Sequence, residues 1–142
     1  ALEIVEQCKE AGIANLDALL IPIGGGGLTA GCCLAMEQQM PSCKVYAVEP
    51  EGYDDHVRSL QAGKRLEVEG SPSSICDSLQ AVSPGKNTFP ITSRLLAGAF
   101  AVSDEEVRHA MLVAFETLQI VLEPGGAAAL AAVLSGKLPS PG

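Results

Sequence analysis

The sequence has 142 residues, a net charge of −8, 47% hydrophobic residues and 4% aromatic residues. This length is enough for one globular domain or for part of a larger one. The acidic balance and the lack of a basic cluster exclude nucleic acid and anionic membrane surfaces as expected partners, and no apolar run is long enough to span a membrane.

The order of apolar and helix-favouring segments predicts an α/β fold. In chain order, the expected elements are helix 1–11, strand 18–23, helix 28–40, strand 44–49, helix 54–62, an irregular stretch over 63–90, helix 89–97, strand 99–102, helix 103–118 and helix 127–134. Strands that alternate with helices form a parallel sheet covered on both faces. The expected architecture is therefore a three-layer α/β/α arrangement around a short parallel sheet.

The helix that starts near residue 103 has the clearest signals. Ser103 and Glu106 match a capping box, in which each side chain accepts a hydrogen bond from the other residue's backbone. Six apolar residues follow at the spacing of one buried stripe, namely Val107, Ala110, Met111, Ala114, Phe115 and Leu118. The helix over 127–134 is small and apolar on all sides, so we expect it to be buried.

Four consecutive glycines, Gly24 to Gly27, join the first expected strand to the helix that follows it. A bare turn at a helix N-terminus presents several N–H groups and the positive end of the helix dipole, which favours phosphate. A P-loop is excluded because no Gly-Lys-Ser/Thr follows. A loose dinucleotide pattern over Gly25, Gly27 and Ala30, with Glu49 downstream, is weak because any glycine run matches it easily. A tight turn without a ligand stays an alternative.

A second candidate site follows the next strand, where residues 49–55 hold four carboxylates around a proline and a glycine. Oxygen ligands in this density suit a hard divalent cation. The alternative is a solvated loop whose aspartate caps the next helix. Both this segment and the glycines follow strands of a parallel sheet, so they are expected at the same edge.

The five cysteines form no Cys-x-x-Cys pair and no pattern with histidine that suits a metal. We interpret them as reduced, mostly buried thiols of a cytoplasmic protein, with a reactive thiol as the alternative. The two histidines, His56 and His109, are expected at the surface.

The run from Pro22 to Gly31 resembles the tetraglycine loop of the fold-type II pyridoxal-phosphate (PLP) enzymes, nearest to serine/threonine dehydratases and serine racemases. The resemblance implies part of a tryptophan synthase β-like fold. It also implies that the cofactor phosphate is bound by the loop's backbone amides, those of Gly24, Gly25, Gly26, Gly27 and Leu28. Residues 1–138 would form a partial PLP-binding domain and 139–142 a tail.

The same resemblance implies further site residues. Serine racemase-like members bind Mg²⁺ or Ca²⁺ through ligands that correspond here to Glu49, the Tyr53 carbonyl and Asp55. Glu123 and Asp77 match segments that border the cofactor in the family. Ser78 departs from the family, which usually has glycine there, so a close backbone approach at that position is in doubt.

The function implied by the resemblance is PLP-dependent loss of water and ammonia from serine, threonine or a hydroxyaspartate, with racemisation of serine as the alternative reaction. PLP chemistry needs a lysine Schiff base, and none of the five lysines lies in the family's lysine motif. We therefore expect the later part of a longer enzyme, inactive alone and assembled as a homodimer or a domain-swapped oligomer. A non-catalytic module that binds phosphate or PLP is the competing hypothesis.

Overall fold

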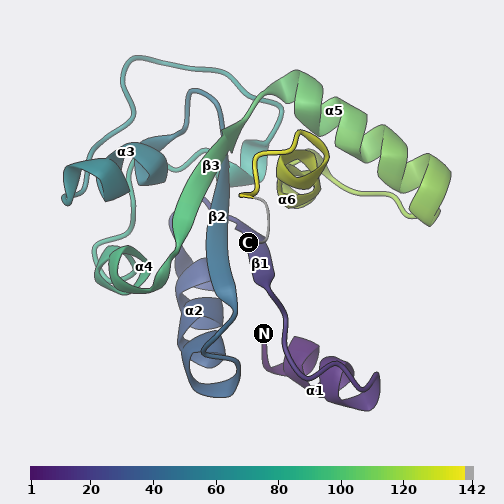
Figure 1. The fold of residues 1–142 in the computed structure, drawn as a ribbon. Helices are drawn as coiled ribbons and strands as arrows, with labels where there is room; N and C mark the ends of the chain where they lie inside the picture. The colour runs from purple at the N-terminus through teal and green to yellow at the C-terminus, as the bar shows by residue number, and fades with distance from the viewer. Residues whose placement is uncertain (140–142) are drawn as a thin grey trace.

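The computed structural model describes residues 1–139 as three layers, with helices on both faces of a central sheet (Figure 1). This arrangement is the predicted α/β/α architecture. The elements are α1 (Leu2–Glu10), β1 (Ala18–Pro22), α2 (Gly27–Gln39), β2 (Lys44–Pro50), α3 (Asp55–Ala62), the 3₁₀ turn η1 (Asp77–Leu79), α4 (Phe89–Leu95), β3 (Gly98–Val102), α5 (Asp104–Val113), the π-helical turn η2 (Ala114–Leu118) and α6 (Pro124–Leu134).

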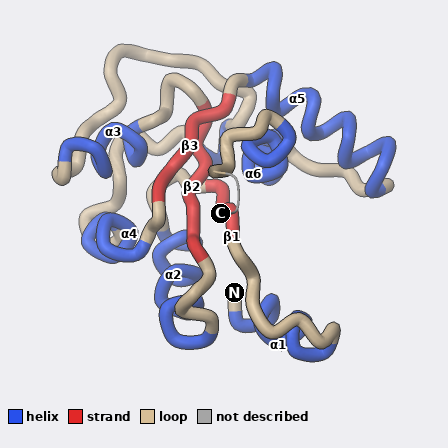
Figure 2. The backbone as a smooth tube through the Cα atoms, viewed as in Figure 1, coloured by secondary structure: helices blue, strands red, loops and turns tan. Residues whose placement is uncertain are grey.

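The sheet is parallel, with strand order β1-β2-β3 (Figure 2). Ile21 pairs with Ala47, and Val48 pairs with Phe100. The central strand β2 is buried along nearly its whole length, because helices cover both of its faces. Most of the predicted tail, residues 140–142, lies outside the described residues.

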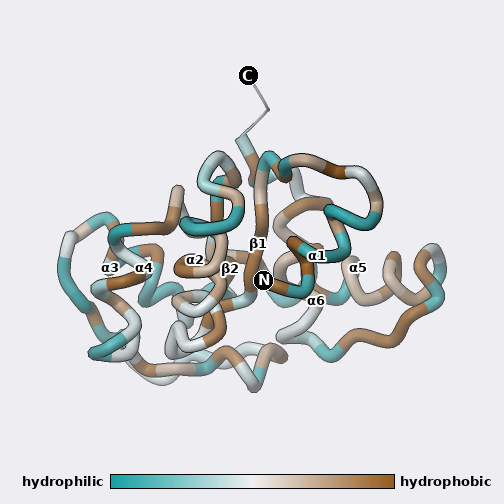
Figure 3. The backbone as a smooth tube through the Cα atoms, turned by 90° about the horizontal axis from the view of Figure 1, so that it is seen from below, coloured by the Kyte–Doolittle hydropathy of each residue, from teal (hydrophilic) through white to brown (hydrophobic). Residues whose placement is uncertain are grey.

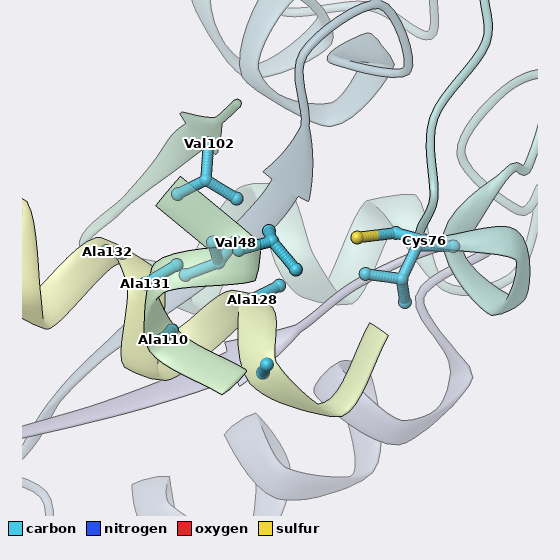
Figure 4. Close-up of a cluster of buried hydrophobic side chains, with 10 residues drawn as sticks. Val48, Cys76, Val102, Ala110, Ala128, Ala131 and Ala132 are labelled. Atoms are coloured by element: carbon cyan, nitrogen blue, oxygen red, sulfur yellow. The ribbon is translucent and has the colours of Figure 1, made fainter. Parts of the chain in front are cut away.

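Small side chains let α6 pack closely on one face of the sheet. Ala128, Ala131 and Ala132 lie against Val48 and Val102, as the close-up in Figure 4 shows. Helix α5 covers α6 from the outside and adds buried residues of its own to the same core. The predicted burial of α6 holds for its sheet-facing side, whereas Val133 and Leu134 are exposed.

The other face of the sheet is covered by α2, which in turn contacts α1 and α4. Its core contains four of the five cysteines, Cys8, Cys32, Cys33 and Cys43. The fifth, Cys76, is buried in the opposite core, and no disulfide joins any of them. These positions confirm the interpretation as buried free thiols. Burial raises the pKa of Cys33 to about 11, which keeps this thiol protonated.

The capping box is present as predicted. The Ser103 hydroxyl accepts a hydrogen bond from the Glu106 N–H at 3.2 Å, and the Glu106 carboxylate accepts one from the Ser103 N–H at 2.7 Å. The buried stripe, however, ends earlier than its spacing predicts. Phe115 and Leu118 are exposed, because the end of α5 and the π-helical η2 that continues it extend beyond α6 and the sheet (Figure 1).

Helix α3 buries a polar face, contrary to the sequence prediction. Its buried residues are Asp55, His56 and Ser59, whereas Val57 and Leu60 are only partly buried. The prediction that His56 lies at the surface is therefore wrong, since its side chain is 0% exposed. The Glu49 carboxylate accepts hydrogen bonds from the His56 and Val57 N–H groups, so the polar start of α3 lies against the end of β2.

The long connection between α3 and α4 has little regular structure, as predicted (tan in Figure 2). It is nevertheless anchored. Cys76 and Leu79 insert into the core, and the Arg65 guanidinium donates to the Pro84 carbonyl at 2.6 Å. This anchoring brings η1 and the start of α4 to the edge of the sheet where the glycine loop lies.

Candidate functional site

The four glycines form the turn between the end of β1 and the start of α2. Gly26 is the N-cap of α2, with a φ of +91° that strains any residue with a side chain. A Cβ on Gly26 would also lie 2.9 Å from the Thr88 hydroxyl. The first N–H groups of a helix have no acceptor within the helix, so α2 presents its free donors at this turn. Glycine at position 26 therefore allows both the positive φ of the turn and the close approach of the Thr88 side chain.

Residues 85–88 support the turn from the side. The Gly25 carbonyl accepts hydrogen bonds from the Gly85 N–H at 3.1 Å and from the Thr88 hydroxyl at 2.6 Å. A Cβ on Gly85 would lie 2.8 Å from this carbonyl oxygen. The sequence analysis missed both supporting residues, because they lie in the irregular segment. A Pro84-Gly85 turn signal was the only hint of their role.

A cavity of about 340 Å³ opens above the turn. It lies between the β1–α2 connection, the η1 turn and the N-terminus of α6. The lining residues are Pro22, Ile23, Gly24, Gly25, Gly26, Gly27, Leu28, Thr29, Ser78, Leu79, Glu123, Gly125 and Gly126. All five residues expected to bind phosphate therefore line one cavity, together with a second helix N-terminus.

Ser78 and Glu123 form the wall opposite the glycines. The Ser78 hydroxyl donates to Glu123 Oε1 at 3.4 Å. A Cβ on Gly125 would lie 2.1 Å from Ser78 Oγ, so the serine side chain occupies the space that this glycine leaves free. Asp77 is not among the lining residues, and its carboxylate accepts the Ser78 N–H at 2.9 Å. The Ser78 side chain therefore fits at this position because Gly125, near the start of α6, has no side chain.

The acidic candidate site lies at the same edge of the sheet. Glu49 near the end of β2 and Asp55 and His56 at the start of α3 are each no more than 1% exposed, and one possible ligand atom from each lies within 4.8 Å of the others. Both Glu49 oxygens accept backbone N–H bonds at 2.9 Å, from His56 and Val57. Asp55 Oδ2 and His56 Nδ1 are buried without a hydrogen-bond partner.

The electrostatics of this group favour a bound positive charge. Burial raises the pKa of Glu49 to about 8, although the two N–H bonds oppose the shift, and burial raises the pKa of Asp55 to about 6. Burial also lowers the pKa of His56 to about 4, so the imidazole is neutral. Among the described residues, the only basic side chain within 4.0 Å of Glu49 and Asp55 is this neutral imidazole. A cation or a proton would compensate the buried carboxylates.

The structure changes the predicted ligand set in one respect. Glu49 and Asp55 lie together as expected, and neither belongs to a solvated loop. His56 lies beside them, where the sequence analysis had placed no ligand. The Tyr53 hydroxyl points elsewhere and donates to the Pro72 carbonyl at 3.1 Å, so only the Tyr53 carbonyl stays a predicted ligand. Asp54 does not cap α3 through its side chain but pairs with Arg58 at 3.0 Å.

None of the five lysines, all within residues 1–139, lines the cavity above the glycines. His109 is exposed on α5, as predicted. In the described part of the chain, every helix is too short or too polar to cross a membrane.

Known proteins match this chain over nearly its whole length. A family model described as "Pyridoxal-phosphate dependent enzyme" matches residues 1–141. A serine racemase from Dictyostelium discoideum is 39% identical over 135 residues, which cover 94% of this chain and 40% of the racemase. A phenylserine dehydratase from Ralstonia pickettii is 40% identical over 131 residues, covering 92% of this chain and 39% of the dehydratase.

Solved structures give the same result. A threonine deaminase from T.th. superposes with a TM-score of 0.91 at 40% identity, covering 97% of this chain and 47% of that chain. The chain therefore spans about two fifths of the length of the curated relatives it matches.

Proposed function

The chain belongs to the family of pyridoxal-phosphate dependent enzymes, and we propose that it provides the phosphate site of an enzyme that eliminates water and ammonia from serine, threonine or a hydroxyaspartate. Its structural neighbours are fold-type II enzymes, which confirms the predicted fold and the predicted family. The observation that carries the proposal is the bare turn of Gly24 to Gly27, open to the cavity at the N-terminus of α2.

The residues present fit a phosphate group. The cavity is lined by the glycine turn, and no acidic side chain belongs to the turn itself. Free N–H donors and the positive end of the α2 dipole point to one place, which is the arrangement that binds phosphate in other proteins. The hydrogen bonds from Gly85 and Thr88 hold the turn in that orientation before any ligand arrives.

When bound, PLP supplies an electron sink that stabilises negative charge at the α-carbon of an amino acid. The chain's own contribution is binding and orientation. The amides of Gly24 to Leu28 would hold the phosphate. The Glu123 carboxylate and the Ser78 hydroxyl, which are hydrogen-bonded to each other, would present a polar wall to the rest of the cofactor.

A charge placed in the turn tests the phosphate site. In Gly25→Asp the new carboxylate would repel phosphate and compete for the N–H groups, and a Cβ at this position meets nothing within 4 Å. Gly31→Asp adds the same charge on the exposed side of α2, also without a clash. In calorimetry with PLP and with inorganic phosphate, we expect Gly25→Asp to lose about tenfold or more in affinity, ~1.4 kcal/mol. Equal losses in both variants would contradict the site.

We expect the purified chain to bind PLP without turning over amino acids. The cofactor's reacting carbon needs a lysine amine beside it, and no lysine lines the cavity in the described part of the chain. An assay for keto acids from serine, threonine and hydroxyaspartate in the presence of PLP checks this. Release at enzymatic rates that is lost on substitution of Lys9, Lys44, Lys64, Lys86 or Lys137 would refute it.

Two alternatives have support of their own. Serine racemases are among the relatives with 39% identity, so racemisation of serine is the alternative reaction. A non-catalytic module that binds phosphate or PLP is favoured by the cavity's lack of lysine. Proton exchange at the α-carbon of serine without keto-acid release would favour racemisation, and phosphate binding without either reaction would favour the module.

A divalent cation is part of the proposal. Glu49, Asp55 and the Tyr53 carbonyl would bind Mg²⁺ or Ca²⁺, both of which prefer oxygen ligands. The support is the burial of both carboxylates and the unpartnered Asp55 Oδ2, which a cation would satisfy. A cation would also balance the negative charge that burial leaves uncompensated.

The cation is tested best at Asp55, because Glu49 also caps α3 and its loss would damage the helix. Asp55→Asn keeps the shape of the side chain and removes its charge. Asp54→Asn removes the same charge from the neighbouring residue, which is not in the buried group. Calorimetry with Mg²⁺ and Ca²⁺ should show binding to the wild type and to Asp54→Asn only. Equal heats in all three proteins would show that the cation does not bind at Asp55.

Self-association also belongs to the proposal. The end of α5 and the segment that follows carry exposed apolar side chains, Leu112, Phe115, Leu118, Ile120 and Val121, and this segment is largely hydrophobic in Figure 3. Such a surface favours contact between copies. Sedimentation should show a homodimer or a swapped oligomer that Phe115→Glu disrupts. The same charge at Leu2, exposed on α1, should leave assembly unchanged.

A further inference from the structure

A single buried imidazole separates the acidic group from the glycine turn. His56 Nδ1 lies 3.7 Å from Glu49 Oε1 and 3.9 Å from Asp55 Oδ2. The neighbouring ring atom, Cε1, lies 3.3 Å from the position that a Cβ on Gly26 would occupy. The ring therefore fills the space beside Gly26, which has no side chain of its own. One side chain thus contacts both candidate sites.

The contact with Gly26 bears on phosphate binding. Gly26 is the N-cap of α2, so the orientation of its backbone sets the direction of the N–H groups at the start of the helix. The Thr88 hydroxyl supports the neighbouring Gly25 carbonyl, and the His56 ring lies against Gly26. A displacement of the ring would change the geometry of the turn, because the packed interior around it has no room to absorb the movement.

The position of the ring depends in turn on the acidic group. His56 Nδ1 and Asp55 Oδ2 are both buried and both lack hydrogen-bond partners, which is unfavourable for each group. A cation held by Asp55 and Glu49 would satisfy Asp55 Oδ2 and would give Nδ1 a partner, either the ion or a water bound to it. The far side of the ring is held loosely, since Nε2 lies 3.5 Å from the Thr92 hydroxyl.

Building on the proposed function, we infer that His56 is a positioning residue that couples the two sites. A divalent cation in the acidic group fixes the ring, and the ring fixes Gly26 in the orientation that binds phosphate. The two affinities are then linked, and each ligand strengthens the other by the same factor. Sequence patterns gave no sign of this role, because it depends on the ring lying between two segments that are distant in the chain.

The test compares phosphate affinity with and without saturating Mg²⁺. In the wild type we expect Mg²⁺ to lower the Kd for phosphate about tenfold, within the usual range of such couplings. In His56→Asn the shorter amide can still face Glu49 and Asp55 but cannot reach Gly26. We therefore expect this variant to bind Mg²⁺, but Mg²⁺ should change its Kd for phosphate less than about twofold. The same substitution at the exposed His109 should leave the coupling unchanged.

A second variant separates positioning from general loosening of the turn. Thr88→Val removes the hydroxyl that supports Gly25 but leaves the histidine in place. We expect it to weaken phosphate binding with and without Mg²⁺ by similar factors, so that the ratio of the two affinities is kept. An unchanged ratio in His56→Asn, or a ratio near one in a wild type that binds both ligands, would overturn the inference.

Amide resonances distinguish this inference from the phosphate site itself. Addition of Mg²⁺ without phosphate should shift the Gly26 and Gly27 amides in the wild type and not in His56→Asn. If those shifts occur although phosphate does not bind, His56 positions Gly26 as inferred and the phosphate site of the proposed function is wrong. If phosphate binds but Mg²⁺ leaves these amides unchanged, the phosphate site stands and the role of His56 is refuted.

Discussion

Replacement of Gly26 by alanine should destabilise the protein and weaken the turn more than any neighbouring glycine substitution. The φ of +91° costs a residue with a side chain roughly 1–2 kcal/mol. The new methyl group would lie 2.9 Å from the Thr88 hydroxyl and 3.3 Å from His56 Cε1, and such overpacking typically costs about 1–3 kcal/mol. The sum predicts a loss of about 2–5 kcal/mol in the free energy of unfolding.

Gly31→Ala is the matched control, five residues along the same helix. Gly31 is exposed, and a Cβ there meets nothing within 4 Å. Alanine in a helix interior should therefore stabilise the protein by about 0.5–1 kcal/mol. Urea unfolding monitored by circular dichroism measures both variants. A Gly26→Ala protein as stable as the wild type, or equal losses in both variants, would refute the reasoning about the turn.

Four further predictions concern the cavity wall and the framework around it. Ser103→Ala removes the capping box and should lower the free energy of unfolding, measured with urea, by about 1 kcal/mol. A decrease below ~0.3 kcal/mol would show that the capping box does not stabilise the protein. Burial raises the pKa of Glu106, but hydrogen bonds, including that from the Ser103 N–H, lower it more, so its pKa lies below the ordinary 4.5. The ionised Glu106 therefore stabilises the fold at neutral pH, and this contribution is lost as the pH falls through its pKa. Glu106→Gln should have a lower free energy of unfolding than the wild type at pH 7, and the same free energy of unfolding once the pH is well below 4.5. The pKa of Cys33 near 11 predicts that, in the folded protein at pH 8, this thiol reacts with iodoacetamide far more slowly than in urea, and equal rates would contradict its burial. Gly125→Ala would place a methyl group 2.1 Å from Ser78 Oγ and should destabilise the protein, and Ser78→Gly in the same protein should restore part of the loss; additive effects would contradict the contact.

The local sequence predicted the elements well because their signals are short-range. Glycines, capping residues and apolar runs act within one turn of helix or one strand. The Ser103–Glu106 capping box appears where its pattern places it. The glycine turn was recognised for the same reason, since four glycines at a strand-to-helix joint have a local meaning.

The parts that the sequence did not predict depend on contacts between distant segments. His56 was expected at the surface but is buried. Its backbone N–H donates to the Glu49 carboxylate, a contact that residue types and spacing do not show. The support of Gly25 by Thr88 joins residues 63 positions apart, inside a stretch that looks irregular in the sequence. The buried stripe of α5 ends early because the helix extends beyond α6 and the sheet, and side-chain spacing does not show where those neighbours end.

The phosphate site is tested most directly by a titration of the isotope-labelled protein with phosphate and with PLP, followed through its amide resonances. The turn at the N-terminus of α2 predicts that the largest shifts fall on Gly24 to Leu28 for both ligands, and that Gly25→Asp needs about ten times more ligand, or more, to produce them. Shifts confined to residues away from this turn, or shifts that follow the wild-type binding curve in Gly25→Asp, would contradict the assignment of the phosphate site.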